Sequence, residues 1–330
     1  MLIVVRTEGG SHVGYGHIYR CISLVRAMQV ELEYINILFV INNQCASLLD
    51  ELGFDYVVSD NFDINYDLDI LKDKSVDLIL FDSYNGTDIY LSKLKSISKL
   101  VIFDDNNDLY SLDNVDVVIN GNVHGATLGY DTSKSTSFLL GTNHLVMKEE
   151  YWNNDTSFID KKGILITTGG TDTYNLTYSF MKNLQKINIP IVVIVGPGFS
   201  NEQINVLEKE KCKNVELIIK PNSLKKYLSK SKYVVTASGS SVYEVLTQKS
   251  IPILFSQAKN QNLAYYEFEK ANVKTIGIYP EINFDKAYNY IKSFEESDIS
   301  NTKIEIDIDG KGAYRVAKYL KNYLVGGNIE

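Results

Sequence analysis

Residues 2–17 read LIVVRTEGGSHVGYGH, and residues 163–172 read GILITTGGTD. Both stretches begin with a β-branched run of strand composition, pass through a glycine-bearing turn and lead into an amphipathic segment. A strand, a glycine turn and a helix in this order form the opening unit of a doubly wound α/β domain. Because the unit opens each half of the chain, the sequence predicts two such domains.

The same alternation of short apolar runs and amphipathic stretches continues along the chain, as expected for parallel strands joined by crossover helices. Strands are expected at residues 2–6, 34–40, 76–81, 99–103, 115–120, 163–168, 191–195, 215–219, 233–237, 251–255 and 273–278. The predicted fold class is therefore α/β, with two doubly wound, Rossmann-like domains. Since such sheets bind ligands beyond the carboxyl ends of their strands, the two domains are expected to face a shared cleft.

The domain boundaries follow from a break in this alternation of predicted strands and helices. The polar segment 148–162 holds the only Trp and is the expected linker. It separates an N-terminal domain (1–150) from a C-terminal nucleotide-binding domain (163–310). Residues 313–324 have the periodicity of an amphipathic helix, within a terminal segment spanning 311–330.

Composition limits the classes of partner. The chain has 330 residues, 45% of them hydrophobic, and a net charge of −8, which argues against general binding to nucleic acid or to an anionic membrane. No apolar run reaches the ~20 residues of a membrane span, so a cytoplasmic location is expected. Three widely separated cysteines, Cys21, Cys45 and Cys212, fit neither a disulfide framework nor a metal cluster. An anionic substrate would need a local site made of helix N-termini and backbone amides.

The turn Gly14-Tyr15-Gly16-His17 is the first motif that could carry chemistry. Its glycines allow close backbone approach to a ligand, and His17 would lie in the first turn of the following helix. Histidine titrates nearest to neutral pH, so His17 could accept a proton from water. The alternative is a tight turn in which His17 only packs or caps.

Three motifs of the second half could bind phosphate, ribose or sugar. Residues 169–172 (GGTD) offer backbone amides after a strand, although Asp172 could simply cap the next helix. Residues 238–241 (SGSS) place amides and hydroxyls at a helix start, as a diphosphate requires, and Glu244 follows one turn later, where it could reach ribose hydroxyls. Alternatively, Ser240 is only an N-cap and Glu244 a surface residue. Asn260 and Gln261 could bind sugar hydroxyls or be solvated.

Acidic residues follow two strands of the first half, in Asp82-Ser83-Tyr84 and Asp104-Asp105. At a carboxyl edge they could hold a metal, act as acid or base, or orient a sugar, and the alternative is that they only cap helices. The sequence has no histidine or cysteine spacing for zinc, and one Asp-Asp pair is insufficient for magnesium. No metal and no cofactor are therefore expected.

These motifs, in this order, resemble the UDP-sugar hydrolases of pseudaminic acid biosynthesis, which release UDP from UDP-2,4-diacetamido-2,4,6-trideoxy-β-L-altropyranose and belong to the GT-B group together with MurG-type transferases. The resemblance covers residues 1–275 approximately, and it implies that the terminal helix crosses back onto the first domain. It also implies that His17 activates water and that Tyr84 places the sugar or that water. Ser240 and Ser241 would meet the diphosphate, and Glu244 the ribose. The substrate-binding residues expected overall are Arg6, Gly14, Gly16, Asp82, Asp105, Asn122, Gly170, Thr171, Asp172, Gly239, Ser240, Ser241, Glu244, Asn260 and Gln261.

Three positions depart from the family pattern: Glu8 replaces Asp, His144 replaces Tyr and Lys148 replaces Arg. The expected activity is metal-independent, inverting hydrolysis of a UDP-diacetamido-trideoxyhexose to UDP and free sugar. A GT-B glycosyltransferase is the alternative, with His17 deprotonating an acceptor hydroxyl instead of water. A nucleotide-sugar sensor without catalysis is a third reading, which would not need His17 and Tyr84 together.

Overall fold

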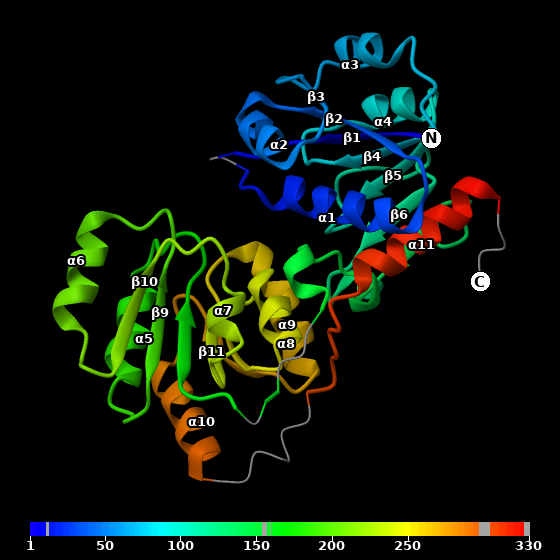
Figure 1. The fold of residues 1–330 in the computed structure, drawn as a ribbon. Coiled ribbons are helices and arrows are strands. Elements are labelled where there is room, and N and C mark those ends of the chain that lie inside the picture. Colours follow the sequence, from blue (N-terminus) through cyan, green and yellow to red (C-terminus); the bar gives the residue numbers. More distant parts are fainter. Residues whose placement is uncertain (11–12, 154–156, 159, 297–303, 327–330) are drawn as a thin grey trace. The chain divides into compact units, whose positions relative to one another are not determined.

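The computed structural model describes residues 1–10, 13–153, 157–158, 160–296 and 304–326. Its contacts divide the chain into two compact units. Unit 1 contains residues 1–152 together with 310–330, and unit 2 contains residues 153–309. Each unit is built on one parallel sheet (Figure 1). The predicted α/β class is confirmed.

Unit 1 is built on a seven-stranded sheet in the order β3-β2-β1-β4-β5-β6-β7, with all pairings parallel. Its strands are β1 (Leu2–Thr7), β2 (Asn36–Ile41), β3 (Tyr56–Val58), β4 (Leu78–Asp82), β5 (Lys99–Phe103), β6 (Val117–Asn120) and β7 (Ser137–Leu140). Its helices are α1 (Gly16–Glu31), α2 (Ala46–Leu52), α3 (Ile64–Leu71), α4 (Asp88–Lys95) and α11 (Gly312–Val325), with shorter 3-10 turns at Asn43–Cys45, Gly125–Thr127, Thr142–His144 and Glu149–Tyr151.

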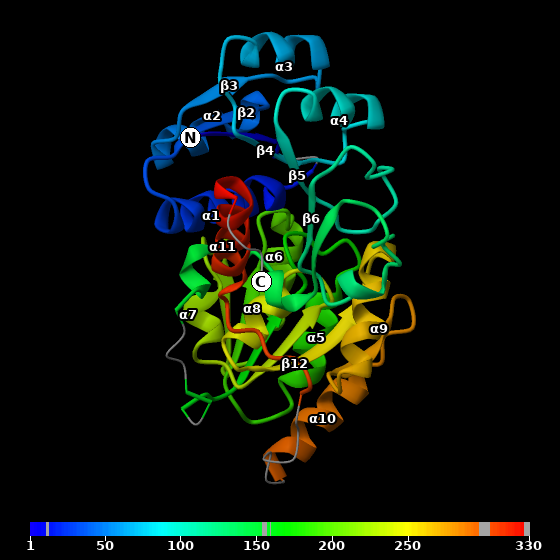
Figure 2. The ribbon, with the colours of Figure 1, turned by 90° about the vertical axis from the view of Figure 1, so that its right-hand side faces the viewer.

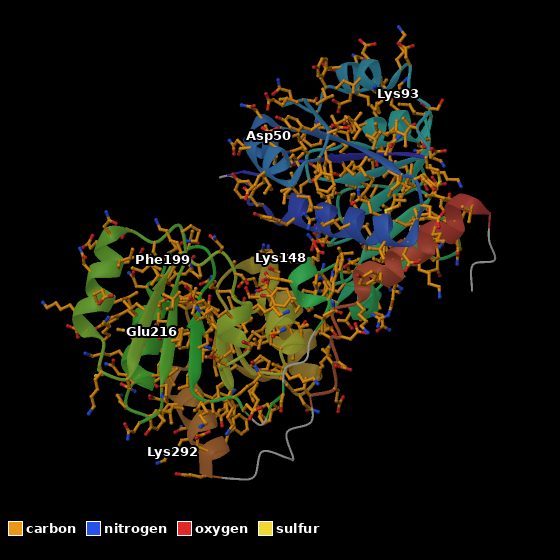
Figure 3. The ribbon with its side chains drawn as sticks, viewed as in Figure 1. Asp50, Lys93, Lys148, Phe199, Glu216 and Lys292 are labelled. Atoms are coloured by element: carbon orange, nitrogen blue, oxygen red, sulfur yellow. The ribbon has the colours of Figure 1, made fainter. Side chains whose placement is uncertain are left out.

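Both faces of this sheet are buried, which explains why its strands read as continuous apolar runs. In β1, Ile3 and Val5 point to a core formed with α1 and α11, while Val4 points to a second core formed with α4. Charged side chains such as Asp50 on α2 and Lys93 on α4 are exposed (Figure 3).

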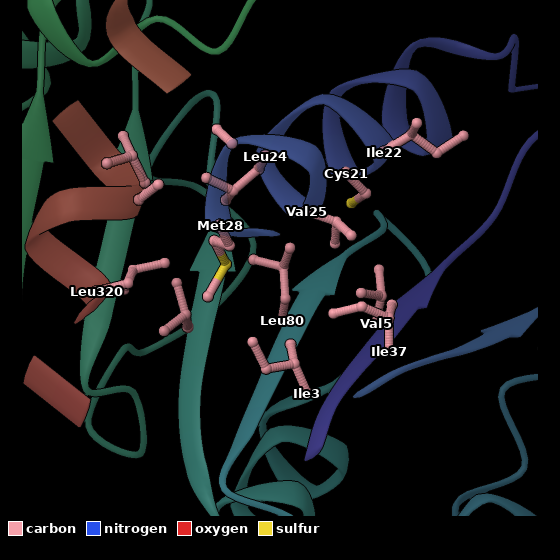
Figure 4. Close-up of a cluster of buried hydrophobic side chains, with 14 of the residues drawn as sticks. Ile3, Val5, Cys21, Ile22, Leu24, Val25, Met28, Ile37, Leu80 and Leu320 are labelled. Atoms are coloured by element: carbon pink, nitrogen blue, oxygen red, sulfur yellow. The ribbon is translucent and has the colours of Figure 1, made fainter. Parts of the chain in front are cut away.

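Helix α11 packs against α1, although some 280 residues separate them in sequence (Figures 1 and 2). Leu320 lies in the same apolar cluster as Leu24 and Met28 of α1 and Leu80 of β4 (Figure 4). The start of α11 approaches the backbone of Leu145 so closely that a Cβ on Gly312 would lie 2.1 Å from the Leu145 carbonyl oxygen. The last helix therefore completes the core of unit 1.

Unit 2 is built on a six-stranded parallel sheet in the order β10-β9-β8-β11-β12-β13. One face is covered by a core that includes α5 and α10, and the other by a smaller core that includes α7 and α8. The elements are β8 (Ile164–Thr167), α5 (Leu176–Leu184), β9 (Ile191–Val195), α6 (Asn201–Glu210), β10 (Val215–Ile219), α7 (Lys225–Leu228), β11 (Tyr233–Ala237), α8 (Ser241–Thr247), β12 (Ile251–Ser256), a 3-10 turn (Lys259–Gln261), α9 (Asn262–Lys270), β13 (Lys274–Ile278) and α10 (Phe284–Glu296).

Arg6 is a structural residue, and the expectation that it binds substrate is wrong. On β1 it follows the alternation that points Val4 to the second core, and its side chain is 2% exposed. Its Nε lies 2.8 Å from Asp67 of α3, its other nitrogens donate to the carbonyls of Val40 and Ser59, and its guanidinium lies over the Phe62 ring. The Arg6 guanidinium therefore pairs with groups inside unit 1.

Lys161 gives unit 2 a testable pH dependence. Its ammonium is buried and donates to the Leu228 carbonyl (2.5 Å) and the Ser250 hydroxyl (3.1 Å). Burial lowers the pKa of Lys161 to about 8, whereas an unfolded lysine titrates near pH ~10.4. Between these values the unfolded chain binds more protons, so the free energy of unfolding rises with pH across that window, by at most about 3 kcal/mol.

Urea unfolding at pH 7.5, 9 and 10 is expected to show this rise in the wild type relative to Lys161→Met. The exposed neighbour Lys162 provides the control, since Lys162→Met should keep the wild-type pH dependence. A wild-type curve that runs parallel to that of Lys161→Met would contradict the assignment.

Candidate active site

His17 lies in the first turn of α1, directly after Gly16. Its side chain is 8% exposed, and its Nδ1 lies 2.7 Å from Oδ1 of Asp82. The long apolar face of α1, with Ile18, Cys21 and Val25 in the core, fixes the helix on the sheet and so fixes the imidazole at the carboxyl edge of the strands.

Asp82 is the last residue of β4, and strand pairing places it beside Thr7 at the end of β1. Burial alone would raise the pKa of its carboxyl, but the Arg20 charge and hydrogen bonds from Arg20 and His17 outweigh burial and hold that pKa below its usual value. Asp82 is therefore ionised, and its carboxylate serves His17 and Arg20. The expectation that Asp82 binds substrate is corrected accordingly.

This pairing fixes the tautomer of His17. An ionised carboxylate only accepts hydrogen bonds, so the short contact requires Nδ1 of His17 to carry a proton. In the neutral ring, Nε2 then holds the lone pair. A ring held in this way can accept a proton at Nε2, with Asp82 stabilising the resulting imidazolium.

Arg20, one turn beyond His17 on α1, joins two carboxylates. Its Nε and one terminal nitrogen donate to the two oxygens of Asp82 at 2.5 and 2.6 Å, and the other donates to Asp105 Oδ1 at 2.9 Å. Asn122 Nδ2 donates to the same Asp105 oxygen at 2.9 Å, and the Tyr84 hydroxyl donates to the other at 2.8 Å. Asp105 and Asn122 thus belong to one hydrogen-bonded network with Arg20 and Tyr84, and their substrate-binding role stays a prediction.

Tyr84 is the most exposed member of this network. Its ring packs edge-on against His17, with centroids 4.6 Å apart, and its side chain is 47% exposed. Burial of the hydroxyl and the charge of Asp105 raise its pKa, so the hydroxyl stays protonated and donates. Tyr15, just before α1, and Tyr19 of α1 are also exposed, and a Cβ placed on Gly14 or Gly16 would meet no atom within 4 Å. The sequence-predicted residues of unit 1 other than Arg6 therefore gather at one edge of its sheet.

Glu8 follows β1 at the same edge and is buried. Its carboxylate accepts hydrogen bonds from Ser83 and from the Asn85 amide, the residues on either side of Tyr84. Glu8, where the family pattern has Asp, thus holds the segment that carries Tyr84. The His144 ring contacts the Leu140 carbonyl, and the Lys148 ammonium lies over the Tyr19 ring, 5.5 Å from its centroid.

In unit 2, three neighbouring strands bring the remaining predicted residues to one edge. Residues 169–172 follow β8, 238–241 follow β11, and 257–261 follow β12. Gln257 Nε2 donates to the Thr168 carbonyl at 2.8 Å, and the Ser238 hydroxyl donates to the Gln261 carbonyl at 3.3 Å, so the loops are tied together. Gly170, Thr171, Ser240 and Asn260 are exposed there, while Gly239, Ser241, Glu244 and Gln261 are partly buried.

Asp172 is turned inward, toward the start of α5. Its carboxylate is buried and accepts from the backbone N–H groups of Leu176 (2.8 Å) and Thr177 (2.9 Å) at the start of α5. It caps this helix, and its expected substrate-binding role is wrong. Gln257, which the sequence did not single out, has a buried Oε1 without a hydrogen-bond partner among the described residues. In the sequence, the one signal for Gln257 as a site residue was its position directly after a buried strand.

Comparison with known proteins gives a distant but consistent picture. No protein-family model matches the chain. An uncharacterized protein of Methanocaldococcus jannaschii is 25% identical over 98% of this chain and 66% of its own length. The chain thus spans just under two thirds of that relative. The UDP-2,4-diacetamido-2,4,6-trideoxy-beta-L-altropyranose hydrolase of Campylobacter jejuni is 24% identical over 268 residues, which cover 79% of this chain and 93% of the hydrolase. The predicted resemblance to this hydrolase is confirmed.

Solved structures extend over nearly the whole chain. MurG of Acinetobacter baumannii superimposes with a TM-score of 0.66 at 11% identity, covering 97% of this chain and 99% of MurG. The Arabidopsis thaliana protein UGT89C1, complexed with UDP-L-rhamnose, gives a TM-score of 0.66 at 10% identity, over 99% and 95% of the two chains. The chain has the GT-B fold. In this GT-B protein, no described helix is both long and apolar enough to cross a membrane.

Proposed function

We propose that this GT-B protein hydrolyses a UDP-activated diacetamido-trideoxyhexose to UDP and the free sugar, a step of nonulosonic acid biosynthesis. The observation that carries the proposal is the His17–Asp82 pair, in which an ionised carboxylate 2.7 Å from Nδ1 leaves Nε2 as the proton acceptor. Sequence similarity to the Campylobacter jejuni hydrolase supports the choice of substrate class.

The reaction is an inverting displacement at the anomeric carbon. Water forms a bond to that carbon from the face opposite UDP, while the bond from the carbon to the diphosphate oxygen breaks with its electron pair leaving on UDP. The water proton passes to Nε2 of His17 and later to solvent. Tyr84, whose ring lies against the imidazole, would place the sugar or the water.

The UDP moiety is assigned to unit 2. Ser240 and Ser241 stand at the carboxyl edge after β11 and would meet the diphosphate, and Glu244, in the first turn of α8, would meet the ribose. Asn260 and Gln261 would contact the sugar or phosphate end. UDP is a good leaving group, so the site mainly has to stabilise charge on the departing phosphate.

The acidic residues of unit 1 support a reaction that needs no divalent metal. Asp82 and Asp105, which could otherwise ligate a cation, already share the guanidinium of Arg20. The Asp104 carboxylate accepts from the backbone N–H groups of Asn106 and Asn107 and from the Tyr130 hydroxyl. A reaction rate that EDTA leaves unchanged is therefore expected.

The deciding experiment incubates the purified protein with a panel of UDP-diacetamido-sugars in ¹⁸O-labelled water, without any acceptor. Release of UDP, with one ¹⁸O atom at the anomeric carbon of the free sugar, is expected. UDP release that strictly requires an added acceptor would instead make the protein a glycosyltransferase. Tight UDP binding without turnover of any sugar would indicate a nucleotide-sugar sensor.

A further inference from the structure

Arg20 lies at the centre of the unit 1 network but has no role in the proposed chemistry so far. It stands three residues after His17 on α1, so both side chains share one face of the helix. Its Nε and two terminal nitrogens contact Asp82 and Asp105, and its guanidinium lies over the Phe103 ring, 4.5 Å from the centroid. The side chain is 20% exposed.

These contacts leave Arg20 little capacity to bind a phosphate. All three nitrogens of the planar fork donate to carboxylates, and Asp82 accepts through both of its oxygens. An anionic ligand would meet a guanidinium whose charge is already shared by two carboxylates at 2.5 to 2.9 Å. Arg20 therefore acts inside the protein.

The orientation of the carboxylate that meets His17 depends on this grip. The two oxygens of Asp82 accept from two nitrogens of Arg20, which fixes the plane of the carboxylate, and Oδ1 then faces Nδ1 of His17. The Arg20 nitrogen nearest to His17 is 3.3 Å from Nδ1, farther than Asp82. Arg20 thus orients Asp82, the partner of the imidazole, rather than the imidazole itself.

The net charge of the network also favours proton transfer to His17. Asp82 and Asp105 carry one negative charge each and Arg20 carries one positive charge, which leaves the network at −1 while His17 is neutral. Transfer of a proton to His17 brings the network to zero. A buried network that becomes neutral as the base accepts its proton favours that transfer, because unbalanced charge is costly away from water.

We propose that Arg20 is a positioning residue that clamps Asp82 and Asp105 with one guanidinium, so that Asp82 holds His17 with its proton on Nδ1 and its lone pair on Nε2. The role in catalysis rests on the proposed hydrolysis, whereas the clamp itself is a property of the free protein. Lysine cannot replace arginine here, because one ammonium is a point charge without the fork that meets two carboxylates.

The test is Arg20→Lys, which keeps the charge and removes the fork. We expect kcat for UDP release to fall about 10- to 100-fold with KM changed less than about threefold, as for other residues that orient a catalytic group. Added guanidinium ion is expected to restore part of the kcat of Arg20→Ala. The control is Arg26→Lys on the same helix, whose guanidinium pairs with Glu149 at the surface and whose replacement should leave kcat unchanged.

A second readout needs no activity. The ¹⁵N shifts of the ring nitrogens of His17, assigned by their loss in His17→Gln, are expected to show a proton on Nδ1 in the wild type and a mixture of tautomers in Arg20→Lys. Identical spectra in the two proteins would overturn the clamp. A variant with wild-type kcat, or one in which only KM rises, would overturn the positioning role.

The two proposals can fail separately. If the wild type releases no UDP from any sugar but Arg20→Lys alters the tautomer, then hydrolysis is wrong and the clamp stands. If the wild type is active and Arg20→Lys changes neither kcat nor the ring shifts, then the assignment of Arg20 is wrong and hydrolysis stands.

Discussion

Replacing His17 with alanine is expected to lower kcat for UDP release about 10²- to 10⁴-fold, the usual contribution of a general base. The Kd for UDP should remain close to that of the wild type, because the nucleotide is assigned to loops of unit 2. Single-turnover kinetics would measure the first effect, and calorimetric titration with UDP the second.

The matched control for His17 is His144→Ala. His144 lies in the same unit, but its ring contacts a backbone carbonyl rather than Asp82. This variant should keep its activity. Full activity of His17→Ala would rule out its role as the base, and loss of UDP binding together with turnover would point to a disturbed fold instead.

Replacing Asp82 with asparagine is the second large effect. Asparagine keeps the shape of the side chain, but its amide cannot stabilise an imidazolium as a carboxylate does, and it can present its NH₂ group to Nδ1 and so favour the wrong tautomer. A loss in kcat of about 10²-fold or more is expected, with KM nearly unchanged. Thermal unfolding should also shift to lower temperature, because Arg20 loses the buried one of its two carboxylate partners.

Asp113→Asn provides the comparison for Asp82. Its carboxylate pairs with Lys134 at the surface, where ion pairs contribute little, so both kcat and the melting temperature should stay close to wild type. An Asp82→Asn protein that turns over like the wild type would show that the carboxylate does not serve His17 in catalysis.

Four strands have the bounds that the sequence predicted. Three of them, Lys99–Phe103, Ile191–Val195 and Tyr233–Ala237, are central strands, which are continuous apolar runs ended by polar residues. The fourth, Val215–Ile219, is an edge strand. The strands that sequence reasoning missed are Tyr56–Val58 and Ser137–Leu140, at the two edges of the unit 1 sheet. Both are short and only partly buried, so their composition resembles that of the loops around them.

The predicted site shows where sequence stops being informative. The carboxyl ends of parallel strands share an edge, which is why His17, Tyr84 and Asp105 could be predicted to lie together. Whether a side chain there faces a ligand or a neighbour depends on pairings that sequence does not contain. Asp82 turned to Arg20, and Asp172 turned to the first N–H groups of α5. The spacing of three residues between His17 and Arg20 was the one signal that could have revealed the clamp.

The packing of α11 on α1 has a consequence for biosynthesis. Ala313, Val316 and Leu320 fill the cluster that supports the His17 helix, yet the ribosome adds them only after all of unit 2 has been made. Unit 1 must therefore wait in an incomplete state, with the apolar face of α1 partly uncovered, while unit 2 already has its full sequence. Of these two units, unit 1 is begun before unit 2 and completed after it.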